Sequence, residues 1–132
     1  MLIELSVRTN RRTEFIDITP QIEAAIREHR IRDALCHIWV PHTTAGITVN
    51  EHADPSVARD ILFQLNKVIP FDDDYAHLEG NSAAHIKATL VGCSLNAIVQ
   101  DGRLKLGTWQ GVFFCEFDGP RQRKVWVKFL TD

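Results

Sequence analysis

The spacing of apolar residues predicts short strands in the first part of the chain. Apolar and polar residues alternate through Leu2–Thr9 and Glu14–Thr19, a two-residue period typical of half-buried strands. Ala34–Val40 is an apolar run that ends at Pro41, and Gly46–Asn50 begins another after a polar break. We expect these segments to be strands of one or more sheets.

Two pairs of residues predict the starts of helices. Thr19 stands before Pro20, and an N-cap threonine followed by proline begins a helix that we expect to span Pro20–Glu28. Asp54 stands before Pro55 in the same way. The apolar stripe of this second helix consists of Val57, Ala58, Ile61, Leu62 and Leu65.

A third helix is predicted after a polar loop. The segment from Pro70 to Asn81 has no periodicity and contains three consecutive aspartates, so we interpret it as a loop long enough to be functional. Asn81 or Ser82 can cap the helix that follows, and Gly92 can end it. We expect its inward face to carry Ala83, Ile86 and Leu90.

Short strands joined by turns fill the last third of the chain. Asp101-Gly102 is a strong hairpin signal between two of them. The predicted strands are Leu95–Gln100, Arg103–Leu106, Val112–Phe117 and Lys124–Leu130. The fold class is therefore α+β: a single compact domain over residues 1–132, with mixed or antiparallel sheets folded on themselves like a sandwich and about three flanking helices.

Composition narrows the possible partners and compartments. With 132 residues and 45% hydrophobic content the chain can bury one core. A formal charge of -2 argues against a nucleic-acid partner, which needs clustered basic residues. The start of the chain lacks a secretory pattern and no apolar run is long enough for a membrane span, so we expect a cytoplasmic location without a membrane partner. The cysteines Cys36, Cys93 and Cys115 lie far apart, and we expect reduced thiols.

Three histidines lie in polar motifs and are candidates for a metal site. His42 ends an apolar strand beside Thr43 and Thr44, while His77 and His85 are eight residues apart across a loop and a helix start. Three neutral imidazoles with an open fourth position bind zinc or a similar divalent ion. Spacing alone also allows three unrelated surface histidines.

Carboxylates near the end of the chain are candidates for proton transfer. Glu116 and Asp118 flank Phe117 on a predicted strand, so they project to one side. In a pocket they can serve as a general base or hydrogen-bond a histidine, and Arg121 offers a fork for phosphate. The alternative is a polar strand edge with a local ion pair. Glu51 raises the same choice.

An aromatic motif offers a surface for a flat ligand. Trp109 and Gln110 precede Gly111, which places an indole face beside an amide. Such a tryptophan is also commonly a core residue. The sequence has neither a nucleotide-type glycine loop nor a serine-hydrolase elbow.

Several motifs in fixed order together resemble the YjbQ-like family, also called secondary thiamine-phosphate synthase. The resemblance covers essentially the whole chain. The motifs are His42-Thr43-Thr44-Ala45-Gly46, Val49-Asn50-Glu51, Ala53-Asp54-Pro55, His77-x-Glu79-Gly80-Asn81-Ser82-Ala83-Ala84-His85, Gly107-x-Trp109-Gln110-Gly111 and Glu116-Phe117-Asp118-Gly119-Pro120-Arg121.

The resemblance implies a β-rich fold, a homotrimer with sites near subunit boundaries, and a divalent metal held by histidines. The implied activity is a weak thiamine-phosphate-synthase reaction, which joins hydroxymethylpyrimidine diphosphate to thiazole phosphate and releases pyrophosphate. Histidine ligands favour zinc, whereas magnesium prefers oxygen ligands. The residues expected at the site are Glu116, Asp118 and Glu51 for catalysis; Thr43, Thr44, Asn50, Asn81, Ser82, Trp109, Gln110 and Arg121 for a small phosphorylated substrate; and His42, His77 and His85 for metal.

Two other classes of function fit the same residues. One is a metal-dependent phosphohydrolase, in which Glu116 or Asp118 accepts a proton. The other is a binding module for a small anionic metabolite. The products separate the three functions. A synthase releases pyrophosphate, a phosphohydrolase releases orthophosphate, and a binding module binds its ligand without forming a product.

Overall fold

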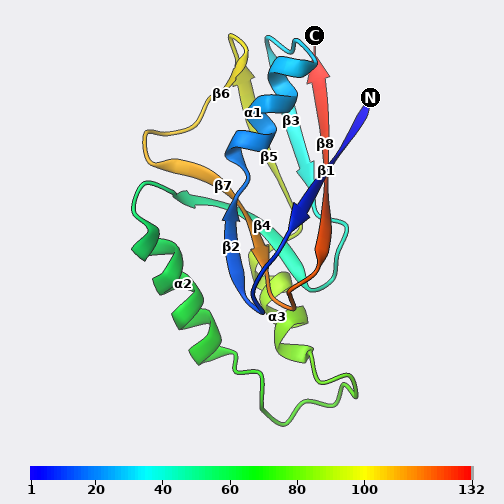
Figure 1. Ribbon diagram of the computed structural model, residues 1–132, viewed down its shortest axis with the longest axis vertical. Coiled ribbons are helices and arrows are strands. Elements are labelled where there is room, and N and C mark those ends of the chain that lie inside the picture. The colour runs from blue at the N-terminus through cyan, green and yellow to red at the C-terminus, as the bar shows by residue number, and fades with distance from the viewer. Residues whose placement is uncertain (132) are drawn as a thin grey trace.

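The chain folds into two antiparallel sheets that face each other (Figure 1). The computed structural model describes residues 1–131, and within them the elements are eight strands and three helices. The five-stranded sheet has the order β1 (Leu2–Arg8), β8 (Gln122–Thr131), β3 (Ala34–Trp39), β5 (Ser94–Gln100) and β6 (Arg103–Leu104). The three-stranded sheet has the order β2 (Glu14–Asp17), β7 (Gln110–Glu116) and β4 (Ala45–Glu51). The predicted α+β sandwich is thereby confirmed.

The main hydrophobic core lies between the two sheets. The five-stranded sheet contributes Val125 and Val127, and the three-stranded sheet contributes Ile47, Val112 and Phe114. These residues are two apart on their strands, as the strand period requires for side chains on one face. The alternation seen in the sequence therefore places the apolar face of each strand inward.

The helices cover different parts of the sandwich (Figure 1). Helix α1 (Thr19–Glu28) packs Ile22 and Ile26 into the main core. Helices α2 (Pro55–Val68) and α3 (Ser82–Val91) lie at the other end of the molecule, against the three-stranded sheet. They close a second, smaller cluster formed by Ala84, Ala88, Phe113, Cys115 and Phe117.

The two predicted helix starts have different outcomes. Asp54 caps α2 as expected, since its carboxylate accepts from the backbone N–H of Ser56 at 2.9 Å. The prediction of a Thr19 cap is wrong, because Ile18 occupies the N-cap position without a side-chain bond. The Thr19 hydroxyl instead accepts from the N–H of Val112 at 2.8 Å, which ties α1 to β7. A long-range partner thus replaced the local one.

The predicted inward face of α3 is only partly right. Ala83 is buried, but Ile86 and Leu90 are exposed. Lys87 is fully buried instead, where its ammonium donates to Asn66 Oδ1 at 2.6 Å. Small alanines let the helix approach the sheet closely, so the buried face rotates toward them and the lysine finds its polar partner on α2. The larger apolar residues therefore face outward.

The hairpin prediction at Asp101-Gly102 is confirmed. Both residues have positive φ, 52° and 79°, as a two-residue turn that matches strand twist requires. The cysteines are free thiols, with Cys36 and Cys115 buried. Among the described residues, every helix is too short or too polar to reach across a lipid bilayer.

Candidate functional site

The predicted site residues separate toward the two ends of the β4–β7 pair. Ala45 lies opposite Glu116 at one end of this ladder, and Glu51 lies opposite Gln110 at the other. At about 3.3 Å per residue the seven-residue strands keep these ends roughly 20 Å apart. We call the first the histidine end: His42, Thr43, Thr44, His77, Asn81, Ser82, His85, Glu116, Asp118 and Arg121. We call the second the dyad end: Asp17, Asn50, Glu51, His52, Trp109, Gln110 and Gly111. One chain therefore does not gather all of them around one pocket.

Two adjoining cavities lie at the histidine end. His42, Thr43 and Cys93 line both of them. The first, about 460 Å³, extends to Thr44, Arg121 and Arg123, and the second, about 470 Å³, extends to His85. The sequence did not single out Cys93 for this site.

The structure fixes one ring nitrogen of His42. Its Nε2 accepts a hydrogen bond from the backbone N–H of Lys124 at 3.0 Å. Burial lowers the pKa of His42 below its usual value, and the positive charge of Arg123 lowers it further. A neutral ring that accepts at Nε2 carries its proton on Nδ1.

His77 and His85 lie close together at the start of α3. Their ring centroids are 5.5 Å apart and nearly perpendicular. His85 lines one cavity with His42 and another with His77. Even so, within residues 1–131 no set of three His, Cys, Asp or Glu side chains is arranged to hold a metal ion. The predicted three-histidine site is not assembled within one chain.

Glu116 is enclosed in a buried ion pair with Arg123. The Arg123 Nε donates to Glu116 Oε1 at 2.9 Å and its Nη2 donates to Oε2. The Thr9 hydroxyl adds a bond at 2.7 Å, and the backbone N–H groups of Phe117 and Asp118 add two at 3.1 Å. Burial acts to raise the pKa of Glu116, but the bonds from Arg123 and Thr9 outweigh it and hold that pKa below its usual value. Glu116 is thus ionised and saturated, which suits positioning better than proton transfer.

The same ion pair holds the Thr44 turn. Arg123 Nη2 also donates to the Thr44 hydroxyl at 2.9 Å and to its carbonyl at 3.3 Å. The sequence contained a signal for this residue, because Arg123 shares the inward strand face of Val125 and Val127. Arg123 is only 2% exposed, so its guanidinium lies in the interior with Glu116 and Thr44.

Asp118 and Arg121 form a more exposed pair beside this network. Asp118 Oδ2 accepts from Arg121 Nη2 at 3.1 Å and from Asn81 Nδ2 at 3.0 Å. Arg121 Nε also donates to the Asp118 carbonyl at 2.9 Å, while 49% of its side chain stays exposed. The Asn81 Oδ1 atom is buried and has no partner in the described part of the chain. Arg121 is therefore oriented yet still open to a ligand.

The dyad end has a different character. Trp109 is 62% exposed, so it is not a core residue. Gln110 Oε1 accepts from the N–H of Gly107 at 2.8 Å, which closes the loop before β7. His52 Nδ1 lies 2.8 Å from Asp17 Oδ2. No sequence signal pairs Asp17 with His52, because Asp17 ends β2 and His52 follows β4, 35 residues further along the chain.

Fold and geometry together define a small α+β sandwich protein. Its candidate functional side chains lie at the two ends of the central β4–β7 strand pair. The chain belongs to the UPF0047 family, since the model described as UPF0047 protein YjbQ-like matches residues 3–132.

Relatives match over nearly their whole length. A UPF0047 protein of Methanocaldococcus jannaschii is 55% identical over all of this chain and 96% of its own, and YugU of Bacillus subtilis is 50% identical over 98% and 99%. The crystal structure of an uncharacterized YjbQ/UPF0047 protein from Clostridium acetobutylicum is 55% identical, covers 97% of this chain and 99% of its own, and superposes with a TM-score of 0.94. The resemblance inferred from the motifs is confirmed.

Proposed function

We propose that the chain binds a small phosphorylated metabolite at the histidine end. The observation that supports this most directly is the cavity shared by His42, Thr43 and Arg121. Two bonds to Asp118 orient the Arg121 guanidinium, which still has an exposed edge for a phosphate oxygen. The hydroxyl of exposed Thr43 and the ring of His42 supply further hydrogen-bond partners.

The reaction we propose is thiamine-phosphate-synthase-type transfer. It joins hydroxymethylpyrimidine diphosphate to thiazole phosphate and releases pyrophosphate. Arg121 would bind the departing diphosphate, and the buried Glu116–Arg123 pair would keep the Thr44 turn in place beside it. The support for this particular reaction is the motif resemblance, and the pocket contributes a phosphate-binding group.

A divalent ion, with zinc favoured over magnesium, is part of the proposal. His77 and His85 are its best-placed ligands because their rings adjoin. His42 would join them only by giving up its bond from Lys124, because Nε2 accepts that bond and Nδ1 then carries the ring proton. One chain does not bring the three histidine ligands together, so the proposed reaction does not depend on a step at the metal. Such an ion would neutralise phosphate charge.

Metal analysis of the purified protein tests this part. We expect His77→Ala and His85→Ala each to lower the bound zinc relative to wild type. His29→Ala, at the end of α1, is the matched control and should keep full metal content. Full metal content in both site variants would contradict the proposal.

Homotrimeric assembly is also proposed. The outer face of the five-stranded sheet supports it, because Leu35, Trp39, Ile98 and Leu130 are exposed there. Light scattering should give a mass near three times 15.0 kDa. A particle of the single-chain mass at micromolar concentration would contradict it.

The cytoplasmic location stays a prediction that cell fractionation would check.

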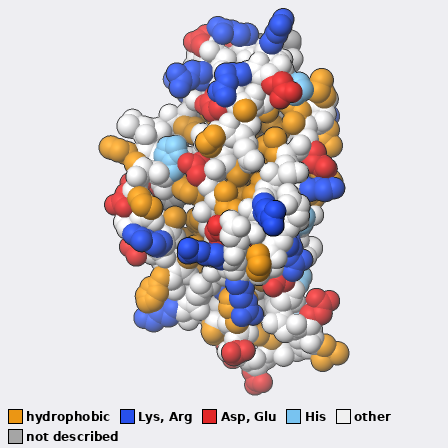
Figure 2. All heavy atoms as spheres, viewed as in Figure 1, with side chains coloured by type: hydrophobic (Ala, Val, Ile, Leu, Met, Phe, Trp, Pro, Cys, Tyr) orange, Lys and Arg blue, Asp and Glu red, His pale blue; other side chains and the backbone are white. Residues whose placement is uncertain are grey.

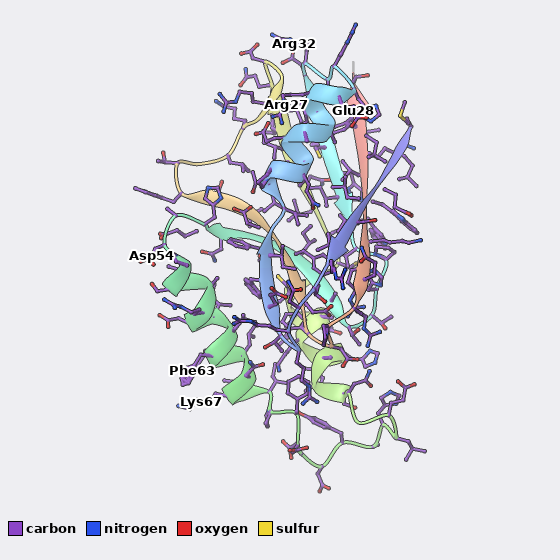
Figure 3. All side chains as sticks on the ribbon, in the orientation of Figure 1. Arg27, Glu28, Arg32, Asp54, Phe63 and Lys67 are labelled. Atoms are coloured by element: carbon purple, nitrogen blue, oxygen red, sulfur yellow. The ribbon has the colours of Figure 1, made fainter. Side chains whose placement is uncertain are left out.

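Product analysis tests the activity itself. The protein is incubated with the two thiamine precursors, and pyrophosphate is measured. Arg121→Gln should reduce pyrophosphate release, whereas Arg32→Gln, between α1 and β3 at the opposite end of the molecule, should not (Figure 3). Orthophosphate released from simple esters would favour a hydrolase instead, and tight binding without any product would favour a binding module.

A further inference from the structure

The dyad end contains a cavity that the proposed function does not use. It has a volume of about 660 Å³, within the range of small-molecule sites. Its walls come from α1, the β6 hairpin and the start of β7. The residues that matter here are Asp17, Arg27, His52, Arg103 and Thr108.

His52 is held in one orientation in this cavity wall. Its backbone N–H donates to the Trp109 carbonyl at 2.9 Å. Its ring lies against Gly111, where an added Cβ would come within 2.3 Å of Nδ1, so only glycine leaves room for it. Its Nδ1 bonds to Asp17 Oδ2 at 2.8 Å, and about one third of each side chain is exposed, 31% and 34%.

Asp17 is itself fixed by a second bond. Its Oδ1 accepts from the backbone N–H of Thr19 at 3.0 Å. Burial acts to raise the pKa of Asp17, but the bonds from Thr19 and His52 hold it below its usual value. An ionised Asp17 keeps the ring proton of His52 on Nδ1. Nε2 is then the atom left for a ligand, and within residues 1–131 it has no hydrogen-bond partner.

Two arginines give the same cavity a positive charge. Arg27 projects from α1 (Figure 3). Arg103 lies on β6, and both arginines line the cavity. Neither guanidinium lies within ion-pair distance of a carboxylate in the described chain. Glu23, the other acid in the wall, accepts from the backbone N–H of Leu104 at 3.2 Å. Figure 2 shows basic side chains gathered at this end of the molecule, over the end of α1.

We propose that this cavity is a second ligand site, which binds a small metabolite through an oxyanion group. Arg27 and Arg103 bind the oxyanion, and His52 Nε2 hydrogen-bonds the ligand. Asp17 is a positioning residue that acts through His52. Within one chain the site is separate from the histidine end, because the two lie at opposite ends of the β4–β7 pair.

Titration of the full chain with inorganic phosphate tests the site. The His52 ring resonances are followed by NMR, so that phosphate bound at the histidine end does not count. We expect a saturable shift in wild type and an affinity about tenfold weaker in Arg27→Gln and in Arg103→Gln, the loss typical of one charge-assisted hydrogen bond. Arg8→Gln is the matched control and should bind as wild type does, and so should His42→Ala.

Two further arms sharpen the result. Acetate in place of phosphate shows whether a carboxylate suffices. In Asp17→Asn the chemical shifts of the His52 ring nitrogens should show that the proton is no longer held on Nδ1. If Asp17 served stability alone, these chemical shifts would not change. A shift equal to that produced by sodium chloride at the same ionic strength would overturn the proposal. Unchanged affinity in both arginine variants would overturn it as well.

Discussion

The two ends of the β4–β7 pair hold their charged groups in opposite ways. At the histidine end, Glu116 and Arg123 are almost completely buried and bonded to each other. At the dyad end, Asp17 and His52 are about one third exposed, and within residues 1–131 the Nε2 of His52 has no hydrogen-bond partner. A buried, saturated pair fixes the backbone around it, whereas a half-exposed dyad can still bind a ligand. The comparison teaches that a carboxylate near a pocket is not by itself a proton acceptor.

Removal of Arg123 should have the largest effect. Arg123→Met leaves Glu116 buried without its partner, which should lower the free energy of unfolding by about 3–5 kcal/mol. Urea unfolding of the purified variant measures this. The double variant Arg123→Met/Glu116→Leu removes both charges and should recover most of the loss. If the double variant were as unstable as the single one, the ion pair would stabilise the fold by more than it costs to bury its two charges.

Acid should act on the two ends unequally. Both Glu116 and Asp17 have a pKa held below their usual values of 4.5 and 3.8. Their contribution to stability is therefore complete above those values and is lost as pH falls through the lower folded pKa. We expect the stability gap between wild type and Glu116→Gln to shrink below pH 4.5, as measured by urea unfolding at several pH values. Asp17→Asn should show the same trend with a smaller gap, because solvent screens the half-exposed dyad. If the difference in stability between wild type and each variant stayed constant down to pH 2, the expectation would be contradicted.

Filling the space beside His52 should have an intermediate effect. Gly111→Ala places a methyl group against the ring, which should cost about 1–3 kcal/mol and displace the ring from Asp17. Thermal unfolding gives the loss, and the His52 NMR signals report the displacement. The same change in a His52→Ala background should cost much less. Equal losses in both backgrounds would mean that the backbone, not the ring, makes the contact.

The smallest effect on stability is expected for Arg121. Arg121→Gln breaks an exposed pair with Asp118, so the free energy of unfolding should fall by less than about 1 kcal/mol. The affinity for phosphate at the histidine end should nevertheless fall, which a binding titration measures. A stability loss as large as that of Arg123→Met would remove the contrast between the two arginines.

The sequence alone determined the type and approximate bounds of nearly every element. Alternation predicted the strands, Asp54-Pro55 predicted the start of α2, and Asp101-Gly102 predicted the hairpin. These signals are local, because a turn, a cap or a strand face depends on residues close in sequence. The ordered motifs also identified the family.

Only the tertiary structure decided how the polar residues meet. Glu116 accepts a hydrogen bond from Thr9, which is 107 residues away in the sequence, and His52 bonds to Asp17, which is 35 residues away. It also rotated α3 so that Lys87 is buried and Leu90 exposed. Sequence spacing fixes which face of a strand a residue occupies, but sheet order and register set its partner across the sheet. That is why the residues predicted for one site are divided between the two ends of a single strand pair.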